Sequence, residues 1–176
     1  MKKISKVSGL FLIISALASI VWIGSYILRM FVTYQIFNET LTGYRPFVNE
    51  QNIQGILEVL NPAVITTFIA YIIFIVFFIF FLVTSKLSLK QNGWLFIITI
   101  LILITAPFEL YLMVIDYKIF TQVNSGIFES NKIITLILER FKNLSTFPII
   151  EVLSYFAIVF LAIFKPMKRE NTTNEN

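Results

Sequence analysis

The stretch PAVITTFIAYIIFIVFFIFFLV, from Pro62 to Val83, decides the fold of this 176-residue chain. It contains no charged residue, and it is long enough to meet the roughly 20 apolar residues that a helix needs to cross a bilayer. Three further apolar runs lie at 7–32, 94–115 and 147–164. The sequence therefore predicts an all-α integral membrane protein, folded as a bundle of four transmembrane helices.

The composition predicts a single membrane domain over residues 1–176. Hydrophobic residues make up 57% of the chain and its mean hydropathy is +0.84, well above the range of soluble proteins. The chain has no His and no Cys, which excludes thiolate nucleophiles, disulfides and metal sites built from imidazole or thiolate. We therefore predict no cofactor, no metal site and no enzymatic activity.

The distribution of basic residues predicts the orientation of the chain. One side of the spans carries most of them in short segments, namely Lys2, Lys3, Lys6, Lys86, Lys90, Lys165, Lys168 and Arg169. By the positive-inside rule, loop 84–93, tail 165–176 and both termini are cytoplasmic, and connections 33–61 and 116–146 lie outside. Because these residues flank spans and form no stripe, the net charge of +4 does not indicate nucleic-acid binding. The abundance of Ile, Phe, Lys and Asn suggests an AT-rich coding sequence, which favours a bacterial inner membrane.

The N-terminal run has a second interpretation. The segment Ala16-Leu17-Ala18 resembles a signal-peptidase site, and lysines precede it. Cleavage there would remove the first span. However, the apolar run continues from Ser19 to Val32, far beyond a signal-peptide core, so the sequence favours an uncleaved anchor.

Each outer connection contains a pattern typical of an amphipathic helix. Apolar residues recur on one helical face at Ile53, Ile56, Leu57 and Leu60, and again at Ile133, Ile137, Phe141 and Leu144. We predict two short interfacial helices, the first of which ends at Asn61-Pro62, where the second span begins. The repeated order of span, loop, helix and span favours a tandem duplication of a two-span unit, with coincidence as the alternative.

Two acids lie within the predicted spans, and a carboxylate in hydrocarbon is costly unless it is paired, protonated or in contact with water. Glu109 follows the helix-bending Pro107 and shares a helical face with Thr105 and Asp116. Glu151 lies one turn after the start of the fourth span, where attraction to the helix dipole alone would explain an acid. Glu109 is therefore the stronger candidate for a functional group.

The first span offers a partner for these acids. Ser15, Ser19, Trp22, Tyr26 and Arg29 recur at intervals of four and three and form its predicted packing face. We predict a polar cluster in the outer half of the bundle, built from Arg29, Glu109 and Glu151 and supported by Tyr26, Thr67, Thr105, Asp116 and Tyr155. The alternatives are a purely structural ion pair, or an Arg29 that extends to the interface and leaves Glu109 unpaired.

Three classes of function are compatible with these residues to different degrees. A non-enzymatic accessory or interaction subunit, bound to lipid and to another membrane protein or a second copy of the chain, fits best. The alternative is a proton- or cation-coupled carrier that works as an oligomer, with Glu109 as its protonatable group. An enzyme within the bilayer is the weakest hypothesis, because the sequence contains no nucleophile–His arrangement and no phosphate-binding loop.

Overall fold

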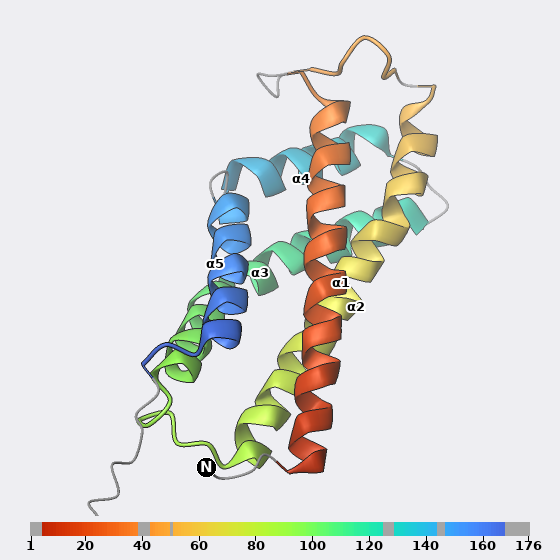
Figure 1. Cartoon of the computed structure of the whole chain (residues 1–176). Helices are drawn as coiled ribbons and strands as arrows, with labels where there is room; N and C mark the ends of the chain where they lie inside the picture. The colour runs from red at the N-terminus through yellow and green to blue at the C-terminus, as the bar shows by residue number, and fades with distance from the viewer. Residues whose placement is uncertain (1–4, 39–42, 50, 125–128, 144–146, 168–176) are drawn as a thin grey trace, which may run out of the picture.

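The computed structural model describes residues 5–38, 43–49, 51–124, 129–143 and 147–167, except for the side chains of residues 130 and 141–143. Within these ranges the chain forms five helices: α1 (Lys6–Ile36), α2 (Ile53–Ser85), α3 (Gly93–Asn124), α4 (Ser130–Asn143) and α5 (Phe147–Phe164). Figure 1 shows that α1 and α5 run along the long axis of the molecule, that α2 and α3 run obliquely, with α3 passing behind α1, and that α4 lies across one end. We call this the α4 end, and we call the opposite end, which carries the α2–α3 connection, the 86–92 end.

Four of these helices are long and apolar enough to cross a membrane, as the sequence predicted. The helix α1 has 31 residues and is therefore about 46 Å long at ~1.5 Å per residue, longer than the ~30 Å hydrocarbon core. The 18 residues of α5 span only about 27 Å. The predicted fold class, a helical-bundle membrane protein, is confirmed.

The first predicted interfacial helix differs from the structure, because residues 53–60 are continuous with the second span in α2 and Pro62 lies inside that helix. Buried residues keep the same spacing on both sides of the proline, at Leu57, Leu60, Val64 and Thr67. A continuous helix therefore keeps one face against α1. The cost is small because Pro62 is exposed, and the backbone bond that it removes would have reached the carbonyl of the exposed Glu58.

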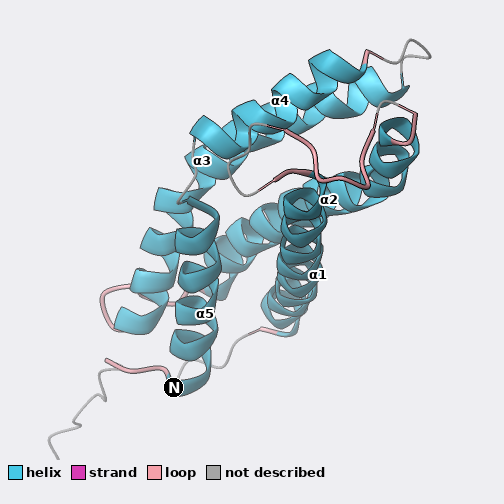
Figure 2. Ribbon diagram, turned by 90° about the horizontal axis from the view of Figure 1, so that it is seen from above, coloured by secondary structure: helices cyan, strands magenta, loops and turns pink. Residues whose placement is uncertain are grey.

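The second interfacial helix is present as α4 and is separate from the spans. Its apolar face is buried at Ile133 and Ile137, while Lys132 is exposed on the other side. Figure 2 shows α4 lying along the end of the bundle, beside the last turns of α3. The two halves of the chain thus share an order of elements. In the first half the interfacial segment is continuous with the following span, whereas in the second half α4 is separate from α5, and the duplication stays a prediction.

The helices α1 and α2 pack side by side through regularly spaced buried residues. In α1 the predicted packing face is confirmed, since every member is buried and the series continues to Thr33 and Ile36. In α2 all the buried residues except Ala70 recur at alternating intervals of four and three: Ile53, Leu57, Leu60, Val64, Thr67, Tyr71, Phe74, Phe78, Phe81 and Ser85. Such a repeat is typical of helices that cross at a small angle with interlocking side chains.

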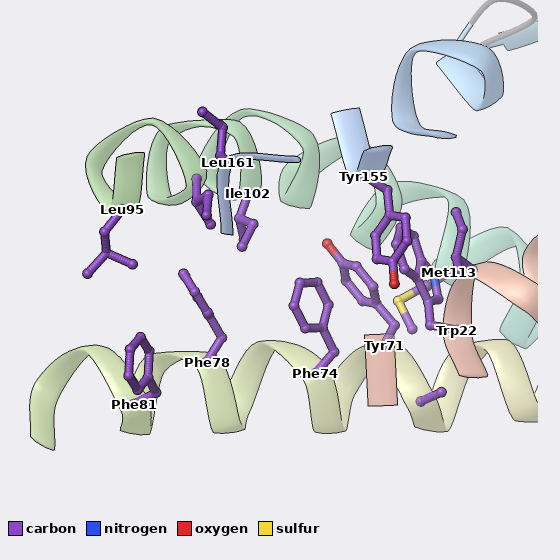
Figure 3. Close-up of a cluster of buried hydrophobic side chains, with 13 residues drawn as sticks. Trp22, Tyr71, Phe74, Phe78, Phe81, Leu95, Ile102, Met113, Tyr155 and Leu161 are labelled. Carbon is purple, nitrogen blue, oxygen red and sulfur yellow. The ribbon is translucent and has the colours of Figure 1, made fainter. Parts of the chain in front are cut away.

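Two apolar clusters fill the bundle at different levels. One extends from Trp22 toward the 86–92 end, where Phe74, Phe78 and Phe81 of α2 point toward α3, as Figure 3 shows. The other lies at the α4 end and includes Ile36, Leu57, Ile115, Ile119, Ile133 and Ile137. The buried polar residues described next lie at the level where the two clusters meet.

Candidate functional site

An ion pair between α1 and α3 forms the first part of the polar site. The Arg29 guanidinium donates a hydrogen bond from Nη1 to Oδ2 of Asp116 at 2.6 Å, and its Nη2 contacts Oδ1 of the same carboxylate. Both side chains are buried, with exposed fractions of 7% and 4%. This two-pronged geometry is the strongest form of the Arg–carboxylate interaction and fixes the register between the two helices.

Arg140 of α4 reaches the same carboxylate from the other side. Its Nε lies 2.9 Å from Oδ1 of Asp116, and its guanidinium lies over the ring of Tyr26, 5.9 Å from the ring centre. Burial by itself lowers the pKa of the Arg140 guanidinium, but the carboxyl groups of Asp116 and Glu109 outweigh burial and hold that pKa above its ordinary value. Arg140 is therefore a fixed positive charge that attaches α4 to the bundle.

Glu109 of α3 and Glu151 of α5 form the second part of the site. They are 0% and 2% exposed, and their carboxyl groups lie close enough to interact with each other and with Arg140. The hydroxyl of Tyr26 lies beside Glu151. Within the part of the chain that the structure describes, all four glutamate oxygens are buried and none has a partner with good hydrogen-bond geometry. Such unsatisfied buried groups are rare in native proteins, and each calls for an explanation such as a bound water, an ion or a chemical role.

A small cavity opens beside this cluster at the α4 end. All five helices contribute to its wall, and its polar lining consists of Tyr26, Arg29, Thr33, Asn61 and Arg140. Its volume of about 50 Å³ exceeds the ~10–15 Å³ that one water molecule needs. The other lining residues are mostly aliphatic. Tyr26 lines the cavity and also faces Glu151, so its side chain connects the two parts of the site.

The structure gathers the residues of the predicted cluster only in part. Arg29, Glu109, Glu151, Tyr26 and Asp116 meet as described above. Three other candidates make separate contacts: Thr67 bonds Ser25 and the Ala63 carbonyl, Thr105 bonds the carbonyls of Leu101 and Ile102, and Tyr155 contacts Ser19 and Trp22. Thr67 and Tyr155 therefore link neighbouring helices, and the Thr105 hydroxyl bonds the backbone of its own helix.

The hydrogen-bonding partner of Arg29 is Asp116 and not Glu109, which corrects the expected pairing. Arg29 follows Lys6, the first residue of α1, by 23 positions, and Asp116 follows Gly93, the first residue of α3, by the same number. Both therefore lie about 35 Å from the first residue of their helices. Glu109 lies about 11 Å lower in α3, since it precedes Asp116 by seven residues.

Sequence reasoning missed Arg140 as a member of the site. It lies in the connection 116–146, where a basic residue is expected to be exposed. A signal was nevertheless present, because Arg140 continues the buried series Ile133 and Ile137 at an interval of three and so falls on the apolar face of α4. A charged residue on a buried face indicates a buried partner, here Asp116.

Comparison of the chain with protein-family models, with curated proteins and with solved structures gives no match. The function is therefore argued from the geometry of the site.

Proposed function

We propose that this chain is a non-enzymatic accessory subunit of a bacterial inner membrane, oriented with its α4 end outside and both termini in the cytoplasm. The observation that carries the proposal is the layering of the bundle. The charged cluster and its cavity lie at the α4 end, while the half toward the 86–92 end is packed with apolar side chains such as Phe74, Phe78 and Ile102. This arrangement supports a binding or sensing role at one face of the membrane.

The same layering weighs against transport by one copy of the chain. A charge that passed from Glu109 to the 86–92 end would have to cross the layer in which Tyr71, Phe74 and Phe78 pack against one another. Moving an ion through such a layer carries a large desolvation cost. The cluster is also enclosed within one protomer, so it does not support a site shared between copies.

The surface of α5 supports an interaction with another membrane helix. Among its residues only Phe147, Glu151, Tyr155 and Leu161 are buried. The exposed residues are large and apolar, and they include Phe156, Phe160 and Phe164. This face contacts either lipid or a partner, which we propose to be another membrane protein or a second copy of the chain.

Two measurements test the accessory role together. The tagged protein would be isolated from its native membrane in a mild detergent, and the purified protein would be reconstituted into vesicles that contain a pH-sensitive dye. We expect a stable co-purifying membrane protein or homo-oligomer, and proton flux no greater for the native chain than for Glu109→Gln. Flux that depends on Glu109 would overturn the proposal.

A second candidate, a proton-coupled carrier, is favoured by one observation, the burial of Glu109 and Glu151 without good hydrogen-bond partners within the described residues. A carrier would need a second conformation in which the layer around Phe74 opens. The vesicle assay described above decides between the two candidates, since only the carrier gives flux that Glu109→Gln abolishes.

A further inference from the structure

We propose that Glu109 and Glu151 share a single exchangeable proton, which enters from the α4 end through the cavity and past Tyr26. This proton-binding site goes beyond the accessory role and does not require it. It also does not require transport, because binding and release would occur on the same side of the membrane.

The balance of charge in the cluster favours one bound proton. Two guanidinium groups, those of Arg29 and Arg140, face three carboxyl groups, those of Asp116, Glu109 and Glu151. With all five groups ionised the cluster would carry one net negative charge, and a net charge buried in a bundle is strongly unfavourable. One added proton makes the cluster neutral. Because Asp116 already accepts bonds from both arginines, the proton belongs to the glutamate pair.

The second argument is the set of unpartnered polar atoms around the pair. In the described part of the chain, the hydroxyls of Tyr26 and Tyr71 are buried and have no partner with good hydrogen-bond geometry, although that of Tyr26 lies beside Glu151, and both tyrosines are exposed by less than 5%. Both hydroxyls interact electrostatically with the two glutamates. A proton between the carboxyl groups supplies the donor that two facing carboxylates lack, as in other paired acids that share one proton.

The space at the glutamate pair favours a proton over a metal ion. The cavity is bounded by Tyr26, Arg29 and Arg140, and neither Glu109 nor Glu151 lines it. A metal ion at the pair would need space for itself and its ligands, whereas a proton needs none. Proton entry requires only a water molecule in the cavity and a group that connects it to Glu151. Tyr26 is the residue placed to do this, because its side chain lines the cavity and its hydroxyl lies beside Glu151, where it accepts a proton as it donates its own to the carboxylate.

The charged and titratable groups that face the pair come from every helix of the bundle. They are Tyr26 and Arg29 of α1, Tyr71 of α2, Asp116 of α3 and Arg140 of α4, in addition to Glu109 of α3 and Glu151 of α5 themselves. Loading transfers one proton from water to a carboxylate oxygen, and release reverses that transfer. No other bond forms or breaks.

Infrared spectroscopy of the reconstituted protein at neutral pH tests the shared proton. Exposed carboxyl groups are ionised at this pH, so a protonated-carboxyl C=O band would come from a buried acid. We expect one such band in the native protein, and a downshift of this band in D₂O as the proton exchanges. Absence of the band in the native protein, or a band that does not respond to D₂O, would overturn the proposal.

Two single substitutions separate a shared proton from a glutamate that is protonated on its own. In Glu109→Gln or Glu151→Gln the remaining carboxylate completes a neutral cluster without a proton, so we expect each substitution to abolish the band. The exposed Glu58, which bonds Gln54, provides the control, and Glu58→Gln should leave the band unchanged. A band that survives in either single variant would show independent protonation and refute the shared proton. A band without Glu109-dependent flux would support this inference while excluding the carrier.

Discussion

At the scale of single residues, Asp116 is the group on which the charged cluster depends. It is the common partner of Arg29 and Arg140, which lie on different helices. Its replacement in Asp116→Asn would leave the buried Arg29 and the partly buried Arg140 without their anion, and removing one member of a buried ion pair typically costs about 3–5 kcal/mol. We expect a loss of that size in the free energy of unfolding, measured in mixed detergent micelles.

Two controls make this prediction specific. The exposed pair Glu129–Lys132, with a separation of 4.0 Å, should lose less than about 1 kcal/mol in Glu129→Gln. In double-mutant cycles, Arg29→Gln should couple more strongly to Asp116→Asn than to Glu109→Gln, since only the first pair shares hydrogen bonds. Equal coupling in the two cycles would mean that Arg29 bonds Glu109 as well.

Tyr26 is expected to control the rate at which the buried proton exchanges. Tyr26→Phe removes the hydroxyl beside Glu151 but keeps the ring that lies beneath Arg140 and lines the cavity. We expect the carboxyl band to remain and its shift in D₂O to slow at least tenfold. Tyr155→Phe is the matched control, because the Tyr155 hydroxyl contacts Ser19 and does not line the cavity. An unchanged rate in Tyr26→Phe would exclude this route.

At the scale of secondary-structure elements, the continuity of α2 through Pro62 makes a prediction about stability. Pro62→Ala restores an N–H that can bond the carbonyl of Glu58 and removes the ring from the interior of the helix. We expect the free energy of unfolding to rise, by an amount on the order of 1 kcal/mol, within the ~3 kcal/mol attributed to a proline inside a helix. Pro148→Ala should give no such gain, since Pro148 lies in the first turn of α5, where its N–H would have no helical acceptor. A loss of stability in Pro62→Ala would indicate that the chain needs a break at this point.

The attachment of α4 to the bundle is expected to depend on Arg140. Its guanidinium bonds Asp116 and lies over Tyr26, while Lys132 on the same helix is exposed. We therefore expect Arg140→Gln to increase amide hydrogen exchange across α4 and to leave exchange in the middle of α1 and α3 unchanged. Lys132→Gln should change neither. Similar exchange in the two variants would show that Ile133 and Ile137 hold α4 in place without the ion pair.

At the scale of the whole molecule, the sequence predicts the spans better than it predicts the contacts between them. A charge-free run such as Pro62–Val83 has one low-energy structure in a bilayer, a helix, because every backbone group must be hydrogen-bonded internally. The pairing of Arg29 depends instead on the relative depth of two helices that are far apart in sequence. Counting residues from Lys6 and Gly93 matches Arg29 to Asp116, but only if both helices begin at the same level.

Other features depended on tertiary packing that the local sequence does not contain. Asn61-Pro62 is a valid helix start by local rules, yet α2 continues through it because Leu57, Leu60 and Val64 bury one common face. The role of Arg140 depends on the position of α4 across the bundle, which brings its guanidinium to Asp116. Local patterns therefore predict the helices, whereas the site depends on how all five helices pack together.

The orientation of the whole molecule can be tested because the native chain contains no cysteine. Gln51→Cys lies in the connection before α2 at the α4 end, and Ser88→Cys lies at the opposite end; both native residues are exposed. With the α4 end outside, a membrane-impermeant maleimide should label Gln51→Cys in intact cells and should label Ser88→Cys only after the membrane is permeabilised. The native chain, without a thiol, is the background control. The reverse pattern would place the cavity beside Arg29 and Arg140 in contact with the cytoplasm, so that a proton taken up by the glutamate pair would come from the cytoplasm.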